Sequence, residues 1–323
     1  MSCFTKTVSV TFFLSLFSFT ALAQTYPDRP VKMIIPYAPG GATDQTGRAV
    51  ANELTRIWGQ PVVLEHRPGA STWIGAEAAA RAAPDGHTLL YSDNSTFVIN
   101  PHLFSKMPID PLRDLEHIAL VMSLSPVLVV NTGLPVNNIA ELLTHARANP
   151  GKLSYASVGP GSSPHLAMEY FNKLAGLSML HGPYKGTAPA LTDLLGGRVN
   201  FLVATLSIME QHEKAGGLRV LASATDRRPS TRPGLPTIGE TLKGYAITSW
   251  YGLAAPKGTP APLLDKINTD ALAAVLDPKF RSSYMAPQAL EPGSGSRQEF
   301  LERVKADFAL WQGIVKLSGA KLD

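Results

Sequence analysis

The chain has 323 residues, of which 45% are hydrophobic and 17% are charged. This balance predicts a compact globular protein without disordered tails, and the length suggests two domains of ordinary size. The formal net charge is +4, and the basic residues are scattered apart from Arg227, Arg228 and Arg232, which lie in a stretch rich in Pro and Gly. A solvated loop accounts for that cluster. We expect no nucleic-acid partner, because a basic stripe with interleaved aromatic residues is missing.

The first residues form a predicted targeting segment. Lys6 is the only charged residue before the apolar run "VSVTFFLSLFSFTALA", and Ala21-Leu22-Ala23 is a small-x-small cleavage site. The run is shorter than the roughly 20 residues that span a bilayer, so a signal peptide over residues 1–23 is favoured over a membrane anchor. Cleavage removes Cys3, the single cysteine, and leaves an exported protein that folds without disulfides. We therefore expect the mature protein in the periplasm.

Strand and helix patterns alternate after the targeting segment. "VKMIIPY" predicts a buried strand, "TDQTGRAVANELTRIWG" a helix that ends at Gly59, and "PVVLEHR" a second strand. "STWIGAEAAARAA" predicts a helix and "HTLLYSD" a third strand. This order is typical of a mainly parallel sheet with helices on its faces.

Two long apolar runs divide the rest of the chain. The run over residues 116–131 is interrupted by Pro126, and the run over residues 245–256 follows the loop rich in Arg, Pro and Gly. A second set of alternating strands and helices lies between them, and helices follow the second run. We therefore predict two α/β lobes joined by a two-strand hinge, with residues 25–124 plus 249–323 in a discontinuous first domain and residues 125–248 in the second. Two separate domains in series are the alternative.

Two strand-to-helix turns share one design. Gly40 and Gly41 let the backbone approach a ligand closely, and Thr43 or Asp44 is expected to cap the helix that follows. In the second turn, Gly159 and Gly161 have this role, Ser162 or Ser163 is the predicted cap, and Pro164 is placed at the first helical position. Free N–H groups at a helix start attract anions, so two such turns in two lobes indicate a shared anion site. Ordinary connecting turns are the alternative.

The enzyme-like interpretations fail on their details. The second turn lacks the third glycine of a dinucleotide fingerprint, and the first lacks the Lys of a phosphate loop, so no nucleotide cofactor is expected. There is no G-x-S-x-G elbow, although Ser162 or Ser163 with His165 as base leaves an exported hydrolase open as an alternative. The histidine spacing predicts no metal site.

Further polar residues follow two other predicted strands. "SDNST" (residues 92–96) and "GPYKGTAP" (residues 182–189) come after strands, where open α/β sheets place their ligand clefts. The second stretch supplies Tyr184, Lys185 and a third helix start at Gly186. Lys185 is either a cationic contact for an anionic ligand or a solvent-facing side chain.

Several separated motifs resemble one family. "YPDRPVKMIIPYAPGGATD", "WGQPVVLEHRPGASTWIGA", "ASVGPGSSPHLAMEYF", "PYKGTAPALTDLLGG" and "SWYGLAAPKGTPAPLLDKIN" are similar to the Bug family, the periplasmic substrate-binding proteins of tripartite tricarboxylate transport systems. The resemblance runs from about Tyr26 to the C-terminus. It implies a non-enzymatic, monomeric protein of the Venus-flytrap type that closes on a small carboxylate and hands it to membrane components of a transporter.

The resemblance also implies a set of binding residues, because such proteins hold the ligand carboxylate largely through main-chain amides and ordered waters. The residues nominated in this way are Tyr37, Ala38, Gly40, Gly41, Asp44, Asn94, Ser95, Ser157, Gly161, Ser162, Ser163, His165, Tyr184, Lys185 and Gly186. One region departs from the family pattern: "VNFLVATL" has Asn200 and Ala204 where relatives commonly carry acids. Thr205, next along, is therefore included as a residue that could change ligand selectivity.

Overall fold

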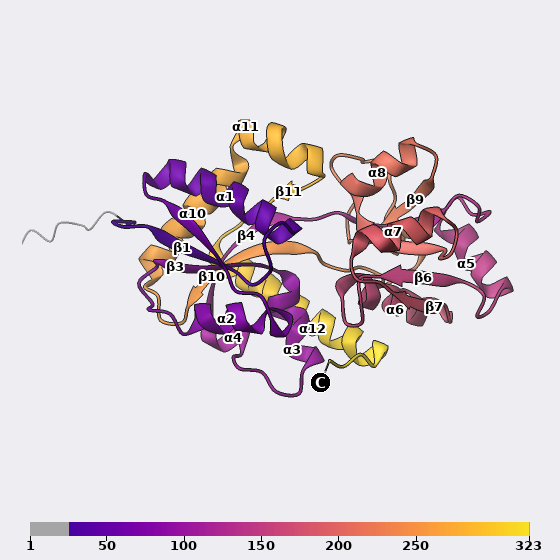
Figure 1. Cartoon of the computed structure of the whole chain (residues 1–323), viewed down its shortest axis with the longest axis horizontal. Helices are drawn as coiled ribbons and strands as arrows, with labels where there is room; N and C mark the ends of the chain where they lie inside the picture. The colour runs from indigo at the N-terminus through magenta and orange to yellow at the C-terminus, as the bar shows by residue number, and fades with distance from the viewer. Residues whose placement is uncertain (1–25, 323) are drawn as a thin grey trace, which may run out of the picture.

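The computed structural model of the protein describes residues 26–322. The predicted signal peptide lies outside these residues. Within the described part of the chain, the strands form a six-stranded sheet with the order β11-β4-β10-β3-β1-β2 and a five-stranded sheet with the order β7-β6-β8-β5-β9. The two sheets are the centres of two lobes that lie side by side in Figure 1. The predicted two-lobed α/β class is confirmed.

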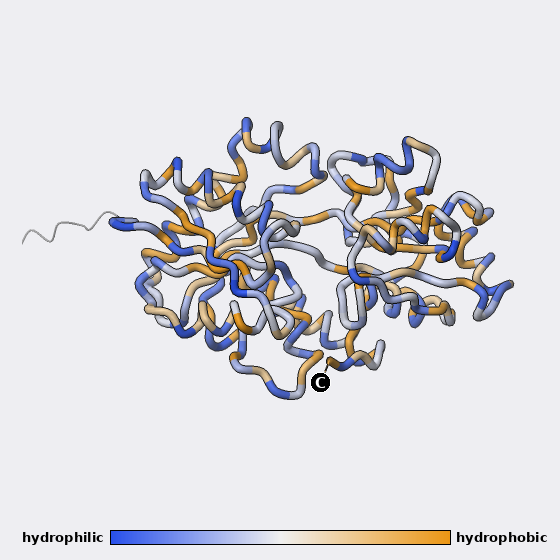
Figure 2. The backbone as a smooth tube through the Cα atoms, in the orientation of Figure 1, coloured by the Kyte–Doolittle hydropathy of each residue, from blue (hydrophilic) through white to orange (hydrophobic). Residues whose placement is uncertain are grey.

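The first sheet takes its strands from the N-terminal and the C-terminal parts of the chain. They are β1 (Val31–Ile35), β2 (Val62–His66), β3 (Thr88–Asp93), β4 (Leu115–Ser123), β10 (Trp250–Pro256) and β11 (Glu291–Pro292). The second sheet contains β5 (Pro126–Asn131), β6 (Ser154–Ser157), β7 (Leu180–Pro183), β8 (Phe201–Thr205) and β9 (Leu218–Ser223). Within the described residues, hydrophobic segments run through the strands of both lobes, whereas many hydrophilic residues lie along the outer loops (Figure 2). Apolar strand faces are therefore buried under the helices, as the alternating pattern predicts.

Helices cover both sheets. Those of the first lobe are α1 (Ala42–Trp58), α2 (Trp73–Ala80), α3 (Asn100–Leu103), α4 (Pro111–Asp114), α10 (Ala261–Leu276), α11 (Pro278–Phe280) and α12 (Arg297–Ser318). Those of the second are α5 (Ile139–Ala148), α6 (Ser163–Ala175), α7 (Thr187–Leu195), α8 (Leu206–Lys214) and α9 (Ile238–Thr241). Within residues 26–322, none of the helices combines the length and apolarity needed to cross a bilayer.

The pairing inside each sheet is mixed. β1 pairs in parallel with β2 and β3, and β6 pairs in parallel with β7 and β8, as the alternating pattern predicts. β10 is antiparallel to β3 and β4, and β5 is antiparallel to β8 and β9. β4 and β5 carry the chain out of the first lobe, and β9 and β10 carry it back. β5 and β10 therefore enter their sheets from the hinge side. They run opposite to the strands that alternate with helices.

The chain passes between the sheets twice. The first long apolar run is divided into β4 and β5, which belong to different sheets and are separated only by Leu124 and Ser125. On the return, only Trp250–Pro256 of the second run is a strand. The Leu124 N–H donates to the Ser249 carbonyl oxygen at 2.9 Å, so the two crossovers are tied together. This is the arrangement expected of a two-strand hinge.

The last helix connects the lobes from the side. α12 begins beside the first sheet and reaches α6 of the second lobe, as Figure 1 shows. Its Trp311 and Ile314 are buried in the same hydrophobic cluster as Phe171 of α6. Beyond α12, the Leu322 N–H donates to the Leu103 carbonyl oxygen at 2.9 Å. The contact between α12 and α6 therefore holds the lobes together away from the crossovers.

Candidate functional site

A cavity of about 370 Å³ lies between loops of the two sheets. This volume falls at the small end of the range for small-molecule sites, which is about 300–1,000 Å³. The loops that form its wall follow strands β1, β2, β3 and β6, where open α/β sheets bind ligands. The wall residues are Tyr37, Ser71, Thr72, Asp93, Ser95 and Asn100 of the first lobe, Val158, Pro160, Gly161, Ser162, Ser163 and Pro164 of the second, and Leu322.

The second glycine turn, between β6 and α6, is built by its own hydrogen bonds. Gly159 and Gly161 have φ angles of 126° and 75°, which favour glycine. The Ser162 hydroxyl donates to the Gly159 carbonyl oxygen at 2.6 Å, and the Gly161 N–H donates to His165 Nδ1 at 3.2 Å. Below the turn, the Ser157 hydroxyl lies 2.6 Å from His181 Nε2. The turn is therefore held rigidly against the cavity.

The start of α6 leaves hydrogen-bond donors for a ligand. Ser162 is the residue before the helix, but its side chain caps no helical N–H, because the hydroxyl is bonded to Gly159. The first N–H bonded inside the helix is that of Leu166, which donates to the Ser162 carbonyl oxygen. The amides of Ser163 and His165 precede it and have no partner inside the helix. Pro164 has no N–H, and it is the second residue of the helix, whereas the prediction placed it first. The first turn of α6 has no acidic residue, so its positive end is not neutralised.

The first glycine turn is different, because it holds its own anion. α1 begins at Ala42, and neither Thr43 nor Asp44 caps it, contrary to the prediction. Instead, the Asp44 carboxylate accepts the Gly40 N–H at 2.9 Å and lies 2.7 Å from His66 Nε2. The Gly40 N–H, and then His66 and Arg48, hold the pKa of Asp44 below its usual value. The buried Asp44 carboxylate therefore fixes the turn in front of α1, and its contacts with Gly40, His66 and Arg48 offset its charge.

Tyr37 and Ser95 are joined by a carboxylate at the end of β3. The Tyr37 hydroxyl donates to Asp93 Oδ1 at 2.8 Å, and the Ser95 N–H donates to the same atom at 3.1 Å. Burial raises the pKa of Asp93 above its usual value, although the bond from Tyr37 opposes this. The proton of Tyr37 is thus committed to Asp93, and its oxygen offers an acceptor to the cavity. Asp93 is a positioning residue for this wall.

A strained loop supplies another part of the wall. Ala70, Ser71 and Thr72 have φ angles of 43°, 48° and 82°, and such conformations cost of order 1–3 kcal/mol each for residues other than glycine. The predicted helix over residues 71–83 is therefore wrong at its start, and α2 begins at Trp73. Asn100 Nδ2 donates to the Ser71 carbonyl oxygen and to Thr72 Oγ1, and Thr96 Oγ1 donates to Thr72 Oγ1 at 2.9 Å. This buried network holds the loop in place.

The structure brings five of the nominated residues to the cavity wall: Tyr37, Ser95, Gly161, Ser162 and Ser163. Ser157 and His165 support the second turn from below, and Asp44 and Gly40 bond to each other. The nominated residues outside the wall are Ala38, Gly40, Gly41, Asp44, Asn94, Ser157, His165, Tyr184, Lys185, Gly186 and Thr205. Contact between these residues and a ligand stays a prediction.

Some of these outlying residues have other contacts. Asn94 is buried, and its Nδ2 donates to the Thr248 carbonyl oxygen in the return crossover at 2.8 Å. The Tyr184 hydroxyl donates to Asp193 at 2.8 Å, and Lys185 is exposed. Asn200, in the segment that departs from the family pattern, accepts the Ser154 N–H at 2.8 Å. Thr205 precedes α8 and pairs with Pro126 beside the first crossover.

Sequence reasoning missed Asp93, Ser71, Thr72, Asn100 and Leu322. Asp93 stood in the polar stretch after β3, and its position as the last strand residue was a usable signal. Ser71 and Thr72 were hidden by the helical pattern that follows them. Asn100 and Leu322 reach the wall through tertiary packing, for which the local sequence carries no signal.

The serine–histidine contacts do not form a nucleophile pair. His165 Nδ1 accepts the Gly161 N–H, and the nearby serines of the turn do not bond to His165 within the described residues. The Ser157–His181 pair has suitable spacing, but Ser157 is fully buried beneath the turn. A substrate cannot reach it.

Two histidines under the second turn make its stability depend on pH. The rings of His165 and His181 lie 4.2 Å apart between centroids, and burial lowers the pKa of each below 6.5. His165 lowers the pKa of His181 further, and the Glu169 carboxylate opposes the shift in both. Because the folded pKa lies below the unfolded one, the unfolded state binds more protons in this window. The stabilising contribution is therefore complete above about pH 6.5 and is lost as the pH falls toward the folded pKa.

We expect the melting temperature to fall between pH 7.5 and pH 5.5, and to fall less in His181→Gln. Glutamine retains a polar partner for Ser157 but does not titrate. Thermal unfolding followed by circular dichroism at both pH values measures the difference. An unchanged pH dependence in the variant would contradict a role for this pair.

The two sheets, the double crossover and the loop-lined cavity define a two-lobed binding protein. The family model described as "Tripartite tricarboxylate transporter family receptor" matches residues 46–319. BugT of Bordetella pertussis is 34% identical over 302 residues, which cover 93% of this chain and 92% of BugT.

Solved structures agree with this match. The structure of Rpa4515 from R. palustris with adipate has a TM-score of 0.79 and 33% identity, and the match covers 92% of this chain and all of that one. The periplasmic binding protein BugD has a TM-score of 0.74 and 34% identity, over 92% of this chain and 99% of that one. The chain therefore belongs to the tripartite tricarboxylate transporter receptor family, whose members are solute-binding proteins.

Proposed function

We propose that the protein captures a small organic carboxylate in the cavity between its lobes and passes it to the membrane components of a tripartite transporter. The observation that carries this proposal is the start of α6, where a turn without acidic residues lines the cavity with Gly161, Ser162 and Ser163. The wall has no Lys or Arg within the described residues, so neutral donors must hold the charge. Adipate in the structure of Rpa4515 supports a carboxylate ligand.

The energetics require more than a helix dipole. A helix terminus contributes about 0.3–1 kcal/mol toward an anion, and up to about 2 kcal/mol when partly buried. Micromolar binding corresponds to about 8 kcal/mol. Hydrogen bonds to charged groups contribute about 1.5–3 kcal/mol each, so several direct or water-mediated bonds in a closed cavity supply the remainder. The Ser163 amide and the hydroxyls of Ser71 and Ser163 are the donors that the wall offers for them.

Capture is coupled to a movement of the lobes. We assign residues 25–124 and 249–323 to one domain and residues 125–248 to the other, which the sheet membership of the strands supports. The crossovers at Leu124–Ser125 and Ile247–Ser249 are then the hinge. A ligand that contacts both walls favours the closed state, and closure is the signal that the transporter reads.

The proposal includes export and a monomeric state. Cleavage after Ala23 releases the protein into the periplasm, the compartment in which BugD is described as a binding protein. The protein acts there as a monomer and without a cofactor. Its role is binding rather than catalysis, as the match to a family of transporter receptors supports.

Calorimetric titration with adipate and with its uncharged diamide tests the proposal. The two compounds share a carbon chain, so we expect saturable binding of adipate and at least tenfold weaker binding of the diamide, because only the carboxylate meets the donors of α6. Native mass spectrometry of the freshly purified protein identifies any acid that co-purifies. Equal binding of both compounds would overturn carboxylate recognition. Recovery of a chemically altered acid after denaturation would favour the alternative function, an exported enzyme that acts on a small acid.

A further inference from the structure

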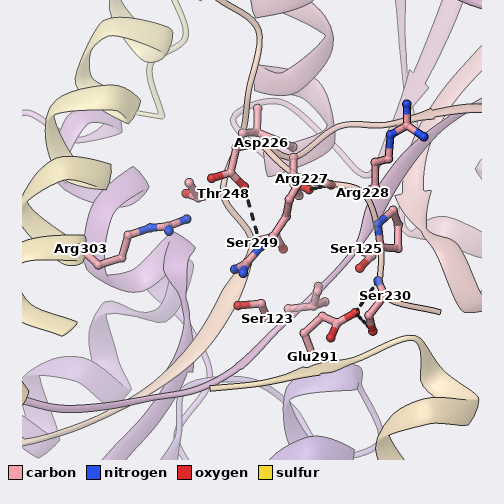
Figure 3. Close-up of a pocket in the computed structure, with 14 residues that line it drawn as sticks. Ser123, Ser125, Asp226, Arg227, Arg228, Ser230, Thr248, Ser249, Glu291 and Arg303 are labelled. Atoms are coloured by element: carbon pink, nitrogen blue, oxygen red, sulfur yellow. Dashed lines mark hydrogen bonds and ion pairs between the residues drawn. The ribbon is translucent and has the colours of Figure 1, made fainter. Parts of the chain in front are cut away.

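A second cavity, of about 160 Å³, lies at the crossovers between the lobes. Both crossovers contribute to it, through Ser123–Ser125 on the way out and Ile247–Ser249 on the return. The loop after β9 and α12 complete the wall, and in Figure 3 Arg227 and Arg303 point toward the space whereas Arg228 points away from it. The remaining wall residues are Thr225, Asp226, Arg227, Arg228, Pro229, Ser230, Glu291 and Arg303.

Two guanidinium groups end in this cavity with unused donors. Arg303 of α12 donates from Nε to both oxygens of Asp307 at 3.0 Å, and its terminal nitrogens make no hydrogen bond within residues 26–322. Nε of Arg227 lies 4.0 Å from Asp226 Oδ1, which is beyond hydrogen-bond length. In Figure 3 both side chains reach into the space beside Ser249. The two arginines come from different lobes.

Arg228 and Glu291, also in the wall, are already paired. Arg228 contacts both oxygens of Glu240, at 2.9 and 2.7 Å. Glu291 accepts the Ser230 N–H at 2.9 Å. Asp226 is 59% exposed and Arg227 is 65% exposed, so water screens both charges to a similar extent. The groups that a ligand in this cavity would meet without a hydrogen-bonded charge partner are therefore Arg227, Asp226 and the terminal nitrogens of Arg303.

Hydroxyl groups surround the two arginines. The side chains of Ser123, Ser125 and Ser249 line the cavity and have no hydrogen-bond partner in the described part of the chain. Ser125 is only 5% exposed, so its hydroxyl has little access to solvent other than through the cavity. A wall of hydroxyls and guanidinium groups supplies donors for an anion and offers little to an apolar ligand.

We propose that this hinge cavity binds a small tetrahedral oxyanion, phosphate or sulfate. Such an ion has five heavy atoms, and a cavity of about 160 Å³ holds it with a few waters, each of which takes about 30 Å³. Guanidinium groups bind oxyanions through paired N–H donors, which Arg227 and Arg303 supply. Because the arginines belong to different lobes, binding is coupled to the hinge angle and hence to the carboxylate cavity.

Titration of the full mature protein with sodium phosphate and, separately, with sodium sulfate tests this site. Isothermal calorimetry at constant ionic strength is the measurement. We expect saturable binding of at least one ion, with affinity at least tenfold lower in Arg227→Gln and in Arg303→Gln. Arg81→Gln is the matched control, since Arg81 is exposed on the surface beside α2 and pairs with Glu77 at 2.7 Å. Its affinity should equal that of the wild type.

Ser162→Trp distinguishes the hinge cavity from the carboxylate cavity. Measured without a carboxylate present, this variant should keep its oxyanion affinity, because Ser162 does not line the hinge cavity. Absence of saturation by both ions, or loss of affinity in Ser162→Trp with full affinity in Arg227→Gln, would overturn the proposal. Arg227 is exposed in a loop, so its substitution leaves the fold intact even if Arg303→Gln is destabilised by the loss of its partner Asp307.

Discussion

Ser162→Trp is expected to weaken carboxylate binding by at least about 100-fold, or about 2.7 kcal/mol, and to leave the melting temperature nearly unchanged. Ser162 lines the cavity directly before α6, in an extended conformation that any residue adopts. An indole at this position fills the space in front of the Ser163 and His165 amides. The fold loses only the hydroxyl bond to Gly159, which contributes about 1 kcal/mol.

Two companion variants make this result interpretable. Ser162→Ala removes the same hydroxyl without filling the cavity, so it should bind within tenfold of the wild type. Gly234→Trp adds the same indole to the loop after β9, where Gly234 is exposed, has no neighbouring atom within 4 Å of a built Cβ and lies outside the wall. It should also bind within tenfold. Calorimetry with adipate and small-angle scattering measure affinity and closure. If Ser162→Trp closes normally on the ligand, the start of α6 is not part of the binding site.

The sequence predicted the architecture because its large-scale pattern has few solutions. Alternating strands and helices require two layers of helices on a sheet, and a break such as Pro126 inside a long apolar run marks a change of sheet. Strand order did not follow from the same pattern. β10 lies between β3 and β4. This position depends on which strand edges are still unpaired when the chain returns to the first sheet, and the local sequence does not encode it. The antiparallel pairing of the crossover strands has the same origin.

The site was predicted unevenly for a physical reason. The second turn was predicted because glycines such as Gly159 and Gly161 favour a left-handed backbone and serines are common at the start of a helix. The same rules predicted an equivalent anion site at the first turn, and ligand contact there stays a prediction. They could not show that Asp44 accepts a hydrogen bond from Gly40 instead of capping the helix. The left-handed Ser71 and Thr72 contradict local propensity, and only a tertiary network holds them in that conformation.

Gly293→Ala is expected to cost at least about 4 kcal/mol of stability and to lower the melting temperature by about 10 °C. A Cβ atom at this position would lie 1.7 Å from the Leu120 carbonyl oxygen and 2.8 Å from the Val121 carbonyl carbon. These are backbone atoms of β4, so no side-chain rotation relieves the overlap. Separating the strands also breaks the bond of 2.8 Å from the Gly293 N–H to the Val121 carbonyl oxygen.

Gly313→Ala is the matched control for that substitution. Gly313 lies inside α12 with no neighbouring atom within 4 Å of a built Cβ, so alanine should be neutral or stabilise by about 0.5–1 kcal/mol. Urea unfolding of both variants measures the difference, and a Gly293→Ala variant as stable as Gly313→Ala would contradict the packing of β11 on β4. The consequence reaches the hinge, because Glu291 of β11 binds the Ser230 N–H of the second lobe. Displacing β11 therefore loosens a contact between the lobes as well as the edge of the first sheet.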